Sequence, residues 1–151
     1  MFKNFREGMR MAWIKKDLEE AIKARGYYVV YYPSAEANRL AGIYPDVQDT
    51  IEMMKRQEAD GMTIPAIRYV LIRKSLDQTV MAYLLLHEYA HVLIVDSDGV
   101  NPLKFGHTTA FFEAEEKTCK LLGISNKEGP EDYDENGKPI RGRGMFREGN
   151  I

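Results

Sequence analysis

One stretch limits the fold of this chain more than any other: residues 79–95, TVMAYLLLHEYAHVLIV. Nearly every position in it is apolar or small, and a helix that is apolar nearly all round is a buried helix. Three ionisable side chains, His87, Glu88 and His91, lie near its centre. Because burying such groups without partners costs several kcal/mol or more, the fold must supply something that compensates for their burial.

The spacing of the three residues indicates what that compensation is. His87 and His91 are four residues apart, so their imidazoles share one helical face, and Glu88 falls within the same third of the helix circumference. His-Glu-x-x-His on a helix is the pattern in which two histidines bind Zn²⁺ and the glutamate acts on a zinc-activated water. We therefore predict that His87 and His91 are zinc ligands and that Glu88 is a general acid/base.

The alternatives to a zinc site are a membrane span, a buried helix whose polar groups are satisfied by neighbouring side chains, and a chance match on an exposed helix. A span needs about 20 apolar residues, and ionisable groups at its centre disfavour it. A chance match on an exposed helix would have polar flanks, whereas these flanks are apolar. Motif and context agree only for the zinc site.

A catalytic zinc usually has three protein ligands and one position for water, so a third ligand is needed. The metzincin spacing is excluded, because it requires Gly at position 94 and His at position 97, where this chain has Ile94 and Ser97. His107 is favoured, since it is the only other histidine and begins a predicted helix. The carboxylates that remain candidates are Asp96, Asp98, Glu113, Glu115 and Glu116.

The rest of the sequence predicts a small α+β domain over residues 1–124. Helices are expected over 12–25, 46–58 and 108–122, strands over 27–32 and 64–73, and an ambiguous segment, with a candidate strand, over 39–44. Ser75 and Gln78 match a capping box, which would begin the motif helix at about Leu76 and let it run to Val95. We expect a short mixed sheet packed with the motif helix and further helices.

Composition excludes several classes of protein. With 44% hydrophobic residues, 29% charged residues and a net charge of −2, the chain has the composition of a soluble globular domain, with no general attraction to nucleic acid or to an anionic membrane. Its single cysteine, Cys119, excludes an internal disulfide framework and a four-cysteine zinc ribbon. Charges within residues 1–20 interrupt any signal-peptide region, so the expected location is cytoplasmic. Residues 125–151, rich in Gly, Pro and charge, are expected to form a polar, flexible tail.

The string HEYAH at residues 87–91 and the string GHTTAF at residues 106–111 resemble the SprT/Spartan-type zinc metalloproteases. In that family a third zinc histidine opens the helix after the motif helix, in an H-x-x-x-F-like segment. The resemblance implies a small zincin fold, a peptidase activity, Glu88 as catalytic acid/base, and the zinc ligands His87, His91 and His107. Family members often have Gly directly after the third histidine, where this chain has Thr108.

The function predicted from these observations is that of a zinc-dependent endopeptidase. The strand before the motif helix, residues 67–74, is a candidate edge for pairing with an extended polypeptide substrate, and ordinary sheet core is the alternative. Two other functions stay open: a regulatory or DNA-associated peptidase that cleaves one specific partner, and a zinc-stabilised binding module without turnover. Family members that act on DNA–protein crosslinks carry basic or zinc-binding DNA modules, which this sequence lacks, so nucleic-acid binding is expected to be weak or absent.

Overall fold

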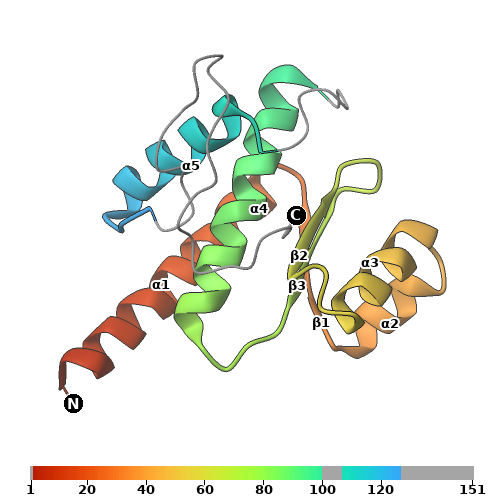
Figure 1. Cartoon of the computed structure of the whole chain (residues 1–151), viewed down its shortest axis with the longest axis horizontal. Helices are drawn as coiled ribbons and strands as arrows, with labels where there is room; N and C mark the ends of the chain where they lie inside the picture. The colour runs from red at the N-terminus through yellow and green to blue at the C-terminus, as the bar shows by residue number, and fades with distance from the viewer. Residues whose placement is uncertain (1, 100–106, 127–151) are drawn as a thin grey trace. The chain divides into compact units, whose positions relative to one another are not determined.

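The structure of the chain, a computed structural model, describes residues 2–99 and 107–126 (Figure 1). Within these residues it is an α+β fold with a mixed sheet, as the sequence predicts, and it contains five helices and three strands. Residues 100–106, and residues 127–151 of the predicted tail 125–151, lie outside the described residues. In chain order the elements are α1 (Phe2–Ala24), β1 (Tyr28–Tyr32), α2 (Ala35–Ala41), α3 (Pro45–Lys55), β2 (Gly61–Ile64), β3 (Tyr69–Arg73), α4 (Gln78–Asp98) and α5 (Thr109–Leu122).

The described residues form two compact units, and the division between them falls within α4, between Tyr89 and Ala90. The first unit contains α1, α2, α3, the sheet and the first part of α4. The second contains the last part of α4 and α5. Helix α4, which carries the His-Glu-x-x-His motif, therefore contributes residues to both units.

The three strands are arranged in the order β1-β3-β2, with β3 in the centre. β1 pairs with β3 in parallel, with Val30 opposite Leu71, and β2 pairs with β3 antiparallel, with Thr63 opposite Val70. The prediction that residues 67–74 form a substrate-binding edge is therefore wrong. Both sides of β3 already pair with neighbouring strands, which leaves no edge for an added chain.

The predicted strand over 64–73 is in fact the end of one strand and the whole of another. β2 ends at Ile64, a turn follows over residues 65–68, and β3 begins at Tyr69. Pro65 has no backbone N–H to donate to a ladder, and Arg68 adopts a positive φ of 57° that does not fit an extended strand. Because most residues from 64 to 72 are apolar, the sequence pattern gives no sign of this turn.

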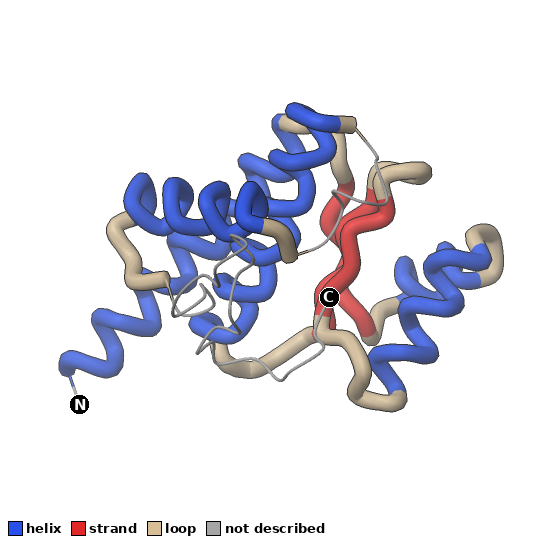
Figure 2. The backbone as a smooth tube through the Cα atoms, turned by 45° about the horizontal axis from the view of Figure 1, so that its top comes forward, coloured by secondary structure: helices blue, strands red, loops and turns tan. Residues whose placement is uncertain are grey.

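Each face of the sheet packs against helices (Figures 1 and 2). Helices α2 and α3 cover one face, and α1 and the first part of α4 lie on the other. The core on the α2–α3 side is formed by eight buried residues: Val30, Ala37, Leu40, Val47, Ile51, Met54, Ile64 and Leu71. Because side chains alternate along a strand, Met62 and Ile64 pack on this side while Gly61 and Thr63 point toward α4.

Helix α1 is longer than predicted, since it begins at Phe2 and ends at Ala24. It buries a stripe of apolar residues three or four positions apart, as an amphipathic helix does. The members of this stripe are Met11, Ile14, Leu18 and Ile22.

Two predicted local structures need correction. Residues 39–41 of the candidate strand 39–44 belong to helix α2, and residues 42–44 form the connection to α3. The N-cap of α2 is Ser34, whose side chain accepts a hydrogen bond of 3.0 Å from the Ala37 N–H. The motif helix begins at Gln78 rather than Leu76, because Asp77 caps it and accepts a hydrogen bond of 2.8 Å from the Thr79 N–H. Ser75 lies two residues earlier, and its hydroxyl accepts a hydrogen bond of 3.1 Å from the Asp77 N–H.

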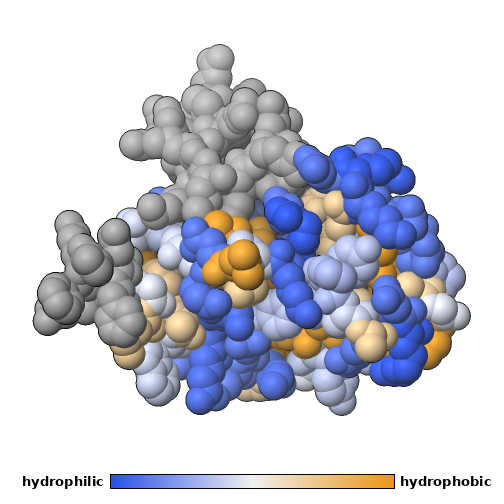
Figure 3. Space-filling view, turned by 90° about the horizontal axis from the view of Figure 1, so that it is seen from below, coloured by the Kyte–Doolittle hydropathy of each residue, from blue (hydrophilic) through white to orange (hydrophobic). Residues whose placement is uncertain are grey.

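Exposed hydrophobic side chains are scattered over the described surface. Hydrophilic residues cover most of the face seen in Figure 3, and hydrophobic residues appear between them in small groups. The large hydrophobic side chains that are exposed are Met9, Trp13, Tyr28, Ile43, Leu76 and Leu121. In the described part of the chain, no helix has both the length and the apolar character needed to cross a membrane.

Candidate metal centre

The motif lies in a part of α4 where most residues are buried, as the apolar sequence predicts. His87, Glu88 and His91 are 4%, 1% and 2% exposed. The residues before and after them are buried too: Leu84, Leu85, Leu86, Ala90 and Val92. Three polar groups are thus held in an apolar environment, where each position along the helix is fixed by the packing of its neighbours.

His107 stands at the start of α5, two residues before the first helical position. The next residue, Thr108, is the N-cap and accepts a hydrogen bond of 3.3 Å from the Phe111 N–H. At the other end Gly123 adopts the left-handed conformation with φ of 69°, which ends the helix. The predicted helix 108–122 is therefore confirmed, and the local sequence alone fixes where His107 stands relative to α5.

Phe111 organises the histidines of the second unit. Its ring is fully buried, and its centroid lies 4.6 Å from that of His91 and 4.9 Å from that of His107. The centroids of His91 and His107 are 5.5 Å apart. Phe111 also packs with Ala90 and Ile94 of α4 in a second, smaller hydrophobic cluster. The same aromatic side chain therefore contacts both this cluster and two of the predicted ligands.

The three predicted ligands form one group. His87, His91 and His107 each offer a ring nitrogen, and these atoms all lie within 4.8 Å of one another. Such a group can hold a metal ion. Imidazole nitrogen is a common zinc ligand, and a set of three protein ligands is typical of catalytic zinc sites, which leave a position for water. The donor set therefore fits zinc.

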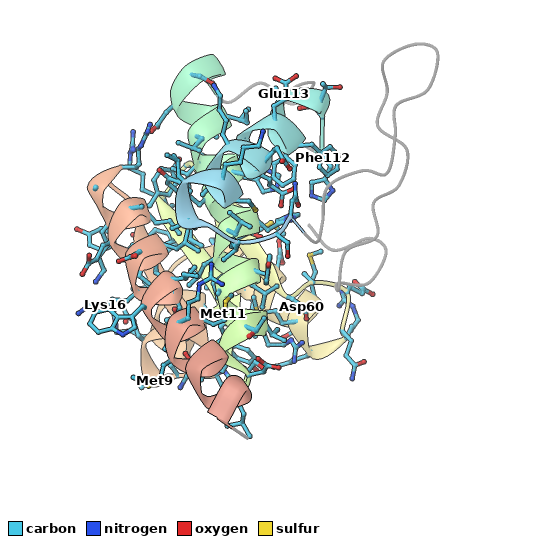
Figure 4. All side chains as sticks on the ribbon, turned by 90° about the vertical axis from the view of Figure 1, so that its left-hand side faces the viewer. Met9, Met11, Lys16, Asp60, Phe112 and Glu113 are labelled. Carbon is cyan, nitrogen blue, oxygen red and sulfur yellow. The ribbon has the colours of Figure 1, made fainter. Side chains whose placement is uncertain are left out.

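Of the carboxylates that the sequence leaves as alternatives, Asp96, Glu113, Glu115 and Glu116 are not part of this group, and the side chain of Asp98 lies outside the described part of the structure. Glu113 is exposed on α5 (Figure 4). Glu116 is exposed on the same helix and forms an ion pair of 3.9 Å with Lys120 one turn later. Asp96 is exposed near the end of α4, and Glu115 is fully buried on α5. The structure therefore places the histidine, rather than any of these carboxylates, with His87 and His91.

Glu88 makes its contacts with the edge of the sheet. The Thr63 hydroxyl donates a hydrogen bond of 2.9 Å to Oε1 of Glu88 and also lies 3.3 Å from the backbone oxygen of Glu88. The other carboxylate oxygen, Oε2, is 4.0 Å from Nε2 of His87. Gly61 lies against the same carboxylate, since a Cβ atom at this position would come within 2.9 Å of Oε2.

Thr63 and Gly61 are site residues that the sequence does not point to. Asp60-Gly61 has the composition of a turn that ends the preceding helix, so no strand is expected there. A signal is present, because Gly61, Met62, Thr63 and Ile64 alternate between small or polar and apolar positions, as strand residues do when only one face is apolar. Four residues are too few for that alternation to stand out.

Comparisons of the chain with protein-family models, with curated proteins and with solved structures found no match. The assignment of function therefore rests on the residues and geometry of the site.

Proposed function

We propose that the chain is a zinc-dependent endopeptidase with a SprT-like active site. The observation that carries this proposal is the group of three histidines, with one ring nitrogen of each within 4.8 Å of the others, next to a glutamate that is 1% exposed. The two histidines and the glutamate have the spacing of the zinc peptidase motif. The position of His107 at the start of the following helix agrees with the family that the sequence resembles.

In this proposal His87, His91 and His107 hold the zinc through their ring nitrogens. A bound zinc supplies Lewis acidity, which polarises the carbonyl of a peptide bond and makes water a stronger nucleophile near neutral pH. Glu88 accepts a proton from the attacking water as the new C–O bond forms. It then returns that proton to the amine nitrogen as the C–N bond breaks, so the carboxylate ends the cycle unchanged.

The low exposure of Glu88 serves this chemistry. Water is largely excluded around a buried carboxylate, so its interaction with a proton donor is less screened than at the surface. The hydrogen bond from Thr63 gives the carboxylate one partner from the sheet, which compensates part of the free energy of burying it. A general base needs a fixed position within hydrogen-bond reach of its substrate, and the packing around α4 provides it.

A zinc-stabilised binding module is the alternative of a different class. A structural zinc is almost always held by four protein ligands, whereas the group in the described residues contains three. A structural site also has no use for a buried glutamate next to its ligands. Both observations favour catalysis over a purely structural site.

Metal removal and replacement test the proposal. The purified protein is assayed on an unstructured polypeptide such as casein before dialysis against a chelator, after it, and after one equivalent of zinc is restored. We expect cleavage to disappear with the metal and to return with zinc. Zinc-loaded protein that cleaves neither unstructured polypeptides nor a panel of folded ones would contradict the proposal and favour the binding module. Cleavage confined to one folded protein would identify the regulatory type of peptidase.

A further inference from the structure

Two residues of β2 contact the carboxylate of Glu88, one at each of its oxygens. Thr63 is 3% exposed, and its hydroxyl donates to Oε1 at 2.9 Å. Gly61, two residues earlier on the same face of the strand, lies against Oε2, with room for no side chain between them. These contacts lie within the first unit, and the hydrogen bond joins residues 25 positions apart in the chain.

The contacts make the two carboxylate oxygens different. Oε1 accepts the hydrogen bond from Thr63, while Oε2 lies on the side of His87, 4.0 Å from its Nε2. A hydrogen bond to a carboxylate is stronger than one between neutral groups, and two buried partners have few other rotamers to adopt. The rotation of the carboxylate about its last bond is therefore set by the sheet and not by α4 alone.

We infer that Thr63 is a positioning residue for Glu88, and that Gly61 keeps open the space in which Oε2 faces His87. The inference rests on the proposed function, since it assigns the proton-accepting role to one oxygen, Oε2, of the proposed base. In this role Thr63 touches neither substrate nor metal. It acts by holding Oε1 so that the other oxygen, Oε2, lies on the side of His87.

Three substitutions separate positioning from a contribution to stability alone. Thr63→Val keeps the shape of the side chain and removes the hydroxyl, Thr63→Ser keeps the hydroxyl, and Gly61→Ala adds the Cβ that would meet Oε2. Thr50→Val is the matched control, because Thr50 is also 3% exposed but its hydroxyl donates to the Asp46 carbonyl within α3. Zinc content is measured for each variant, and kinetics are compared at equal zinc occupancy.

We expect Thr63→Val and Gly61→Ala to lower kcat by roughly 10- to 100-fold with little change in KM, because a misplaced catalytic group affects the chemical step. Thr63→Ser should recover most of the lost kcat, and Thr50→Val should retain the wild-type value. Wild-type kcat in Thr63→Val, or equal losses in Thr63→Val and Thr63→Ser, would refute the positioning role. Wild-type kcat in Gly61→Ala would refute the role of the space beside Oε2.

A second measurement does not depend on activity. Thermal unfolding is followed for wild type, Thr63→Val, Glu88→Leu and the double variant, all at equal zinc content. Each single variant leaves one buried polar partner behind, whereas the double variant removes both, so we expect the double variant to lose less than the summed Tm losses of the singles. Additive losses would show that the two side chains do not interact in solution. If the wild-type protein hydrolyses no substrate, the proposed function fails. The unfolding comparison of the single and double variants still tests whether Thr63 and Glu88 interact.

Discussion

Phe111→Ala should weaken both the fold and the metal centre. The ring is fully buried, packs with Ala90 and Ile94, and lies against His91 and His107. Removing a buried phenylalanine ring typically costs about 3–5 kcal/mol, through lost burial and the cavity left behind. Since a domain of this kind is stabilised by only about 5–15 kcal/mol, the variant should lose a large part of its free energy of unfolding.

The assay for Phe111→Ala is urea unfolding of metal-free and zinc-loaded protein, extrapolated linearly to water. Wild type should gain more stability from zinc than the variant does, because His91 and His107 lose the ring that fixes their orientation. Phe112→Ala is the control, since Phe112 is only partly buried and should cost less. Phe111→Leu retains most of the volume and should lose roughly 1–2 kcal/mol, which keeps a folded variant available for comparison. A loss below ~1 kcal/mol in Phe111→Ala, with an unchanged response to zinc, would refute this reasoning.

Three further predictions concern the metal, pH and nucleic acid. His107→Ala should retain far less zinc by elemental analysis than Glu113→Ala, and the reverse result would assign the third ligand to the carboxylate. Burial, followed by the hydrogen bond to Glu19 and its negative charge, raises the pKa of Tyr31 in the folded state. The stabilisation this gives is fully present below the unfolded pKa of about 10 and is lost as the pH rises above it, so Tm should fall more steeply above pH 10 in wild type than in Tyr31→Phe. With a net charge of −2, the protein should bind labelled DNA at most weakly and with a steep salt dependence, whereas submicromolar affinity at physiological salt would favour a DNA-associated peptidase.

The parts of the fold that follow from local sequence can be predicted. Helix α5 is expected over nearly its whole length, because its apolar residues follow helical spacing and Gly123 is a typical helix-terminating residue. The buried character of α4 follows from its composition, and the four-residue spacing alone places His87 and His91 on one face of the helix. These features need no information from distant residues.

The parts that depend on pairing between distant residues cannot be predicted in this way. The central position of β3 is set by which strands pair with it, and one of them, β2, is too short to give a clear pattern. The sequence therefore leaves open whether residues 67–74 form a free edge or the core of the sheet, and the structure has β3 hydrogen-bonded on both sides. The contact between Thr63 and Glu88 has the same origin, because 25 residues separate the two partners.

In the proposed function, a metal held by three histidines and a base at Glu88 together hydrolyse peptide bonds. The most direct measurement compares wild type, Glu88→Gln and Glu113→Gln, each verified to contain one zinc per chain, in the release of new amino groups from an unstructured polypeptide. Glutamine keeps the volume of the side chain but cannot take up the proton of water. We expect Glu88→Gln to lose roughly 10²- to 10⁴-fold in turnover at unchanged zinc content, while Glu113→Gln remains close to wild type. Turnover of Glu88→Gln close to the wild-type rate would contradict the proposed function.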